Sequence, residues 1–523
     1  MARTTRLLLA LLLVAAAAAL FFRQRDAERP VSPTAAPWET TRKMSPSFAA
    51  EYEKVRAADR IADVGERCLL YPDPDWLHWD REVVAAFCRS RSFGHLTRED
   101  IRAALDQNHP ERLQEAFATY LSDNYADPQK RGILTRVYRE LFSSKATEVR
   151  DVVKRWVDAD PMSAFALAAR GTYYKSAAEA ARGGAYAKDT PSESFESMDK
   201  LAARARKDLE DSLRMSPKLI AAYDALISVG LITSDHALIQ KSVEGGLALD
   251  PADERIYLDW MLTSQPRWGG SLDQMGHVDE IAQQHAAVNP LLKLVTEKKL
   301  AHYGDIERDR GNYAAALERY ETAFKVAPSP VDLGSAGYAA SMLGQHEKAV
   351  WYFSQAYRFD QFNTDSASRR AYELRQLQRP DLAAESLALA ARANTASAEG
   401  LVSEGDAYWN LGQFDAAAHA YEAALKINPR EENALIQLAG VYIGPLKVPA
   451  KAEPLVDALH QYYPDHAHTW YLTAALAGKD EERCFAALKQ YMALVDPNDP
   501  GERSNIGYAK AAIAKHEATA AAK

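Results

Sequence analysis

The stretch from 398 to 431 constrains the fold more than any other part of the chain. It reads AEGLVSEGDAYWNLGQFDAAAHAYEAALKINPRE, with apolar and small residues at the spacing of two amphipathic helices. Gly412 marks the turn between the helices, and Pro429 ends the second one. Small and aromatic residues mark the faces on which the helices pack: Gly405, Ala417, Tyr421 and Ala424. The stretch therefore predicts one compact helical hairpin of 34 residues.

The same register continues towards the N-terminus without a gap. Three further units precede the hairpin, at 364–397, 330–363 and 297–329. Matching small, apolar and turn residues recur in them, among them Gly304, Gly311, Tyr320, Gly337, Gly344, Phe353, Ala371 and Leu387. One hairpin cannot bury its apolar face alone, so the repetition predicts a stack in which neighbours cover one another.

These units resemble the tetratricopeptide repeat, whose period is about 34 residues. The resemblance implies an all-α superhelical solenoid of helical hairpins, with a groove lined by the first helix of each unit. At the family's groove positions this chain has Lys298, Asp305, Arg308, Tyr338, Ser341, Asp365, Tyr372, Arg375, Asp406 and Trp409. The partner-binding residues that we predict are Asp305, Arg308, Tyr338, Tyr372, Arg375, Asp406 and Trp409. The alternative, in which these side chains only cover a solvated helix face, stays open.

The flanking regions are also expected to be helical. We predict a divergent domain of helical hairpins at 47–292, the repeat array at 293–497, and a capping helix with a tail at 498–523. The motif PRWGGS at 266–271 resembles one from a bacterial domain family of unknown function, which implies no activity. Trp268 is interpreted as a packing anchor at a turn between helices, with a ligand-contacting loop as the alternative.

The N-terminus has the features of a membrane anchor or an export signal. Two arginines, Arg3 and Arg6, precede an apolar run at 7–22. That run of 16 residues lies between a signal-peptide core and a full membrane span. We therefore predict a signal anchor or signal peptide at 1–22, followed by a proline-rich tether at 23–46. This predicts a protein bound to the bacterial inner membrane, or exported, with its C-terminal part in the periplasm. Export would permit Cys68 and Cys88 to pair.

Composition and motifs argue against several other functions. The net charge of −9 disfavours a nucleic-acid binder, and the three cysteines match no zinc spacing. No phosphate-binding loop or nucleophile elbow is found, so we expect no cofactor, no metal and no enzyme activity. A possible metal site at Asp465, His466 and His468 is interpreted as a solvated helix start. A possible carboxylate pair in an aromatic cleft is interpreted as turns with core tryptophans, at Asp73, Asp75, Trp76, Trp79 and Asp80.

Together these features predict a membrane-tethered, non-enzymatic scaffold whose groove binds a protein or peptide in the bacterial envelope. Two alternative functions remain open. One is an immunity or antitoxin protein that neutralises a single toxin partner. The other is an enzyme with a pocket between the hairpins of 47–292.

Overall fold

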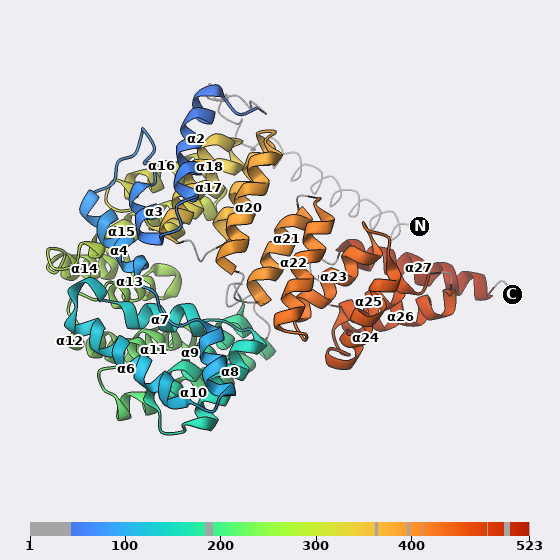
Figure 1. Ribbon diagram of the computed structural model, residues 1–523, viewed down its shortest axis with the longest axis horizontal. Coiled ribbons are helices and arrows are strands. Elements are labelled where there is room, and N and C mark those ends of the chain that lie inside the picture. Colours follow the sequence, from blue (N-terminus) through green and yellow to red (C-terminus); the bar gives the residue numbers. More distant parts are fainter. Residues whose placement is uncertain are drawn as a thin grey trace, which may run out of the picture. The chain divides into compact units, whose positions relative to one another are not determined.

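The computed structural model describes residues 43–183, 192–360, 364–394, 398–410, 412–478, 480–495 and 503–521. Within these residues it contains helices and no strand, which confirms the all-α prediction (Figure 1). The predicted membrane segment at 1–22 and most of the predicted tether lie outside the described residues. None of the described helices is long and apolar enough to cross a membrane.

The region before the repeats consists of paired helices joined by short connections. Its helices are α2 (Pro46–Asp59), α3 (Val64–Leu70), α4 (Arg81–Ser92), α5 (Arg98–Asp106), α6 (Pro110–Ala126), η1 (Pro128–Lys130), α7 (Ile133–Phe142), α8 (Thr147–Ala159), α9 (Ala164–Arg182), α10 (Ser192–Met215), α11 (Ile220–Thr233), α12 (His236–Leu249), α13 (Glu254–Thr263), η3 (Pro266–Trp268), α14 (Leu272–Gln283) and η4 (Pro290–Leu292). One prediction was wrong here, because the helix expected from Phe48 to Leu70 is broken. Asp63 begins a new helix by accepting a hydrogen bond from the Glu66 amide at 2.7 Å.

The repeats follow as hairpins in the predicted register. Their helices are α15 (Lys293–Asp309), α16 (Tyr313–Phe324), α17 (Pro330–Met342), α18 (His346–Phe359), α19 (Thr364–Gln376), α20 (Pro380–Asn394), α21 (Ala398–Asn410), α22 (Phe414–Ile427), α23 (Glu432–Ile443), η5 (Pro449–Lys451), α24 (Glu453–Tyr462), α25 (Ala467–Leu476), α26 (Glu481–Leu494) and α27 (Arg503–Ala521). First helices of neighbouring repeats contact one another, as α15 contacts α17 and α19 contacts α21.

A glycine and an aromatic ring hold the two helices of each clear repeat together. The pairs are Gly304 with Tyr320, Gly337 with Phe353 and Gly405 with Tyr421, and a Cβ atom on the glycine would lie 2.7, 2.7 and 2.3 Å from the ring. Only glycine permits this approach, since real Cβ contacts are longer. In the 364–397 unit, buried Ala371 and Leu387 take the equivalent positions.

The turn between the two helices also repeats. Gly311, Gly344 and Gly412 have φ angles of 79°, 71° and 70°, in the left-handed region. Gln378 holds the same place in the 364–397 unit with a φ of 59°. A residue other than glycine costs about 1–2 kcal/mol in that conformation. The 364–397 unit therefore keeps the repeat geometry despite a weaker sequence.

The N-terminal helices α2 and α3 pack against α18 and α20, the second helices of two neighbouring repeats (Figure 1). Phe48, Tyr52 and Val55 share one apolar cluster with Val350 and Trp351. Helix α18 has no solvent-facing side over its C-terminal three turns, because every residue from 349 to 359 is buried. The predicted domain boundary at 292 stays a prediction, and this packing joins the two sides of it.

Buried polar groups fix this contact. Arg370, fully buried on α19, lies 3.1 Å from Asp59 of α2. The same guanidinium donates to the hydroxyls of Tyr71 at 3.0 Å and Ser386 at 2.7 Å. Removing one partner of such a buried pair costs about 3–5 kcal/mol. The register of the N-terminal helices on the repeats is therefore set by a specific ion pair.

The disulfide between Cys68 and Cys88 joins α3 to α4, and it is the pairing that export would permit. It lies in the apolar cluster that also contains Trp79 and residues of the first repeats. The interpretation of both nearby tryptophans as core residues was half right. Trp79 is buried, whereas Trp76 is 48% exposed, with its ring centroid 6.0 Å from that of Trp351 in a T-shaped contact.

Candidate partner-binding face of the repeats

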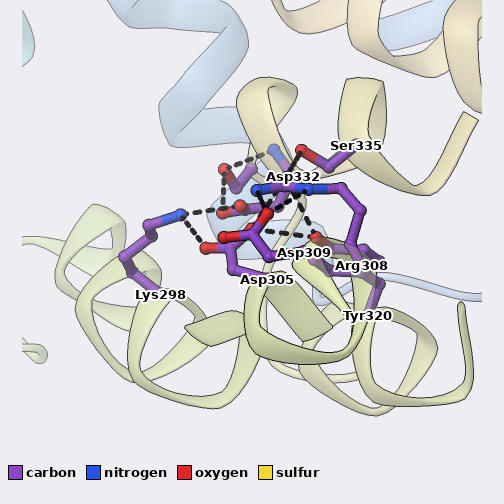
Figure 2. A network of polar contacts seen from close by, with 8 residues as sticks. Lys298, Asp305, Arg308, Asp309, Tyr320, Asp332 and Ser335 are labelled. Atoms are coloured by element: carbon purple, nitrogen blue, oxygen red, sulfur yellow. Dashed lines mark hydrogen bonds and ion pairs between the residues drawn. The ribbon is translucent and has the colours of Figure 1, made fainter. Parts of the chain in front are cut away.

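A polar network joins the first repeat to the second and includes two predicted binding residues (Figure 2). Arg308 Nη1 donates to Asp305 Oδ1 at 3.0 Å, to the Tyr320 hydroxyl at 3.2 Å and to Ser335 Oγ at 3.0 Å. The Tyr320 hydroxyl donates in turn to Asp305 Oδ1 at 2.8 Å. Since Ser335 belongs to α17 and the others to α15 and α16, the network fixes one repeat against the next.

Lys298 extends this network along α15. Its Nζ donates to Asp332 Oδ1 at 2.7 Å and to Asp305 Oδ2 at 3.4 Å. Burial disfavours the ammonium ion, but the nearby carboxylates outweigh that effect and raise the pKa of Lys298. Glu297 is fully buried beside it, and burial together with Asp332 raises the pKa of Glu297 well above its usual value. The first repeat thus holds a compact cluster of charged groups at its junction with the second.

Asp406 in the 398–431 repeat accepts the same kind of hydrogen bond as Asp305 in the first repeat. The Tyr421 hydroxyl donates to Asp406 Oδ1 at 2.7 Å, as Tyr320 does to Asp305. Burial raises the pKa of Asp406. Both aspartates directly follow the glycine that receives the tyrosine ring, so the ring and its hydroxyl are held together. The sequence identified these residues as candidates for binding; the structure gives them internal partners, and their binding role stays a prediction.

Four other predicted residues are exposed on three successive first helices. Tyr338 on α17, Tyr372 on α19 and Trp409 on α21 are 37%, 54% and 36% exposed. Arg375 is also exposed, and it follows Tyr372 by three residues, so both lie on the same side of α19. Tyr338 contacts the edge of Tyr313 from the preceding repeat, with 5.9 Å between ring centroids.

The packing of Trp409 differs because its ring is supported from within its own hairpin. Its centroid lies 5.4 Å from that of Phe414, edge to face. An aromatic ring held in this way loses little conformational freedom when a ligand covers it. The predicted residues therefore fall into two groups: Asp305, Arg308 and Asp406 are engaged in hydrogen bonds within and between repeats, and Tyr338, Tyr372, Arg375 and Trp409 present exposed surface.

The PRWGGS motif forms the tight turn between α13 and α14. Gly269 has a φ of 89°, and a Cβ on Gly270 would lie 2.1 Å from the Ser264 carbonyl oxygen. Ser271 caps α14 by accepting from the Gln274 amide at 3.2 Å, which confirms the predicted helix start. The guanidinium of Arg182 lies 5.5 Å from the Trp268 ring. These contacts favour the packing interpretation of Trp268.

Three of the remaining sequence candidates, His466, Asp73 and Asp80, have structural partners as well. His466 caps α25 by accepting from the His468 amide at 3.2 Å. Asp73 lies 2.6 Å from Arg358 Nη1, and Asp80 caps α4 by accepting from the Glu82 amide at 2.8 Å. These polar groups therefore stabilise helix ends and a contact between segments.

One of the helical hairpins described above matches a known family. Residues 398–431 match the model of the tetratricopeptide repeat family, so the chain carries at least this repeat. No curated protein matches the chain. Among solved structures it is similar to a tetratricopeptide repeat protein from Parabacteroides merdae, with 17% identity, a TM-score of 0.31, and coverage of 49% of this chain and 97% of that one.

Two further structures are similar over a larger share of the chain. Yeast Tom70 has 12% identity and a TM-score of 0.36, covering 80% of this chain and 96% of that one. The tetratricopeptide repeat domain of P58(IPK) has 16% identity and a TM-score of 0.20, covering 73% of this chain and 98% of that one.

Proposed function

We propose that the repeat array at 293–497 is a non-enzymatic scaffold that binds a protein or peptide partner along its first helices. The observation that supports this most directly is the exposure of one large aromatic side chain on each of α17, α19 and α21. Aromatic residues and arginine dominate the energetics of known interfaces because they combine a large contact area with directional polar contacts. Arrays of helical repeats generally bind partners on such extended surfaces.

The spread of the anchors favours an extended segment as the partner. Tyr338, Tyr372 and Trp409 belong to consecutive repeats, so a bound chain would cross three units rather than enter one pocket. Arg375 lies on the same side of α19 as Tyr372 and adds contact area beside it. The ligand class is therefore an extended peptide with apolar residues.

The proposal puts the described residues outside the cytoplasm, in the bacterial envelope. It rests on the apolar run at 7–22 behind two arginines, which is typical of an anchor or an export signal. The disulfide between Cys68 and Cys88 supports it, because disulfides persist in oxidising compartments. A reporter that is active only in the periplasm, fused after residue 523, should be active; an inactive reporter would reverse this topology.

Photo-crosslinking in the native envelope tests the binding face. A photoreactive phenylalanine is placed at Tyr372 or Trp409, with Tyr508 on α27 as the matched control because it is an aromatic residue with 57% exposure. We expect the same adduct from Tyr372 and Trp409 and none from Tyr508. Adducts at all three positions, or none at the first two, would contradict the proposed face. A single dominant partner would favour the immunity-protein alternative over a general scaffold.

A further inference from the structure

A cavity of about 620 Å³ lies between the N-terminal hairpins and the first repeats. Its walls come from α4, the connection after α4, α5, the connection before α7, α7, α13, η4 and α15, with Val331 and Asp360 contributed by the second repeat. This volume falls within the roughly 300–1,000 Å³ of typical small-molecule sites. The proposed peptide face does not use the cavity, since none of its four exposed residues lines it.

Arginine is the most frequent residue in the lining of the cavity. Six arginines line it: Arg91, Arg98, Arg131, Arg136, Arg139 and Arg255. Several are held in place by carboxylates that are not among the lining residues. Arg139 binds Asp224 through two hydrogen bonds of 2.9 and 2.8 Å, and it also contacts Asp259. Arg131 lies 2.8 Å from Asp250. These contacts fix the guanidinium groups before any ligand arrives.

The densest group of these cations surrounds Glu140. Arg91 donates to one carboxylate oxygen at 3.2 Å, His95 Nε2 lies 2.5 Å from the other, and Arg136 is 3.8 Å away. Burial disfavours the charged carboxylate, yet the His95 hydrogen bond and the two arginines outweigh it and lower the pKa of Glu140. Two arginines and a histidine thus share one carboxylate, which leaves positive charge for a second anion.

Arg136 carries an unused donor. Its side chain is only 10% exposed, and its Nη2 donates to the Phe93 carbonyl oxygen at 2.7 Å. Its buried Nε has no hydrogen-bond partner among the described residues. Because that nitrogen is inaccessible to solvent, a ligand in the cavity does not reach it, and Arg136 acts on the cavity through the charge of its guanidinium group.

The lining of the cavity also contains apolar side chains, one of which lies next to the arginines: the Arg91 guanidinium is 5.6 Å from the Phe87 ring centroid. Phe87 of α4, Leu291 of η4 and Leu294 of α15 line the cavity and belong to one core cluster, with Leu258 packed against them. Two further carboxylates, Glu254 and Asp360, also line the cavity. Burial raises the pKa of Glu254, which weakens its repulsion of an anion.

We propose that this cavity binds a small amphiphilic anion, with its acidic head group on the arginines around Glu140 and its apolar body against Phe87, Leu258 and Leu294. Guanidinium groups suit both carboxylate and phosphate heads, because their planar donors bind two oxygens at once. The apolar side chains exclude a bare inorganic ion as the preferred ligand, since such an ion would leave them uncovered.

The test is calorimetric titration of the full chain with decanoate, decyl phosphate, decanol and inorganic phosphate. We expect one of the two acids to bind at least tenfold more tightly than decanol and than inorganic phosphate. The better acid identifies the head group. This comparison needs no variant, so it decides the proposal even if a variant fails to fold.

Variants then locate the site. Arg91→Gln and Arg136→Gln should each weaken binding of the better acid by about tenfold or more, the size of one charge-assisted hydrogen bond. Arg310→Gln is the matched control, because Arg310 lies outside the cavity and its side chain is 65% exposed. The proposal is overturned if neither acid binds the wild type, if decanol binds equally well, or if folded Arg91→Gln and Arg136→Gln bind like Arg310→Gln. None of these outcomes depends on crosslinking at Tyr372, so the two proposals fail separately.

Discussion

Two glycines on the same helix provide a stringent test of how the repeats pack. Gly334 and Gly337 both lie on α17, and a Cβ on Gly334 would meet nothing within 4 Å. A Cβ on Gly337 would lie 2.7 Å from one ring carbon of Phe353 and 2.9 Å from two others. Alanine at either site gains about 1 kcal/mol from helix propensity. At Gly337 the collision adds a cost of about 1–3 kcal/mol, typical of overpacking.

The two substitutions should therefore differ by about 1–3 kcal/mol in local stability. Gly334→Ala stabilises α17, while Gly337→Ala is neutral or destabilising. Native-state hydrogen exchange of the α17 and α18 amides measures this directly, because it reports the opening of one region rather than of the whole chain. Protection in Gly334→Ala should exceed that in Gly337→Ala by about 5- to 150-fold. Equal protection in the two variants would refute the close helix approach on which the repeat geometry depends.

Four further predictions address other parts of the molecule. Trp409→Ala should weaken partner binding by about 2 kcal/mol, or thirtyfold, in a binding assay that Tyr508→Ala leaves unchanged; equal losses would place the binding surface elsewhere. Cys68→Ser should lower the free energy of unfolding by about 3 kcal/mol, since the disulfide spans a sequence separation of 20; a urea midpoint that is insensitive to this change and to reductant would contradict it. The pKa of Glu297 is raised in the folded state, so its contribution to stability is full below the pKa of the unfolded chain and is lost as pH rises through the folded-state pKa. The stability of Glu297→Gln should therefore rise relative to that of the wild type between pH 4 and pH 8. A stability difference between the two proteins that does not change with pH would be evidence against the raised pKa. Arg370→Ala should cost about 3–5 kcal/mol and expose the connection after α2 to protease, and an unchanged cleavage pattern would show that the ion pair does not hold α2 in place.

The repeat register could be predicted because it depends on local signals. Gly405, Gly412 and Tyr421 recur at fixed spacing, and the structure uses each as expected, for helix contact, turn and ring. The exposed positions Tyr372 and Trp409 followed from the same register. In contrast, Asp305 and Asp406 accept hydrogen bonds from the hydroxyls of Tyr320 and Tyr421. These bonds depend on the position of each hydroxyl group in the folded hairpin, and the periodicity of the sequence does not specify that position.

The packing of α2 and α3 on α18 could not be derived in that way. Asp59 and Arg370 are 311 positions apart, and no periodic pattern connects them. A signal was nevertheless present in α18, whose run Val350-Trp-Tyr-Phe353 is apolar on every side rather than along one stripe. A helix that is apolar on every face is buried on every face. This run therefore implied that a second segment covers the outer face of α18, but it did not identify that segment. The cavity was missed for a similar reason, because its six arginines come from five separate segments.

The docking of α2 on α18 and α20 affects the order of events during synthesis. Phe48, Tyr52 and Val55 leave the ribosome more than 300 residues before the last of the surface that covers them, which includes Leu387. At about 5–20 residues per second, these side chains wait roughly 15–60 s for their partners. During this interval they form the exposed apolar face of a helix in a chain that is otherwise folding hairpin by hairpin. A nascent chain of this protein should thus bind chaperones at its first helix until translation passes α20, and release them only then.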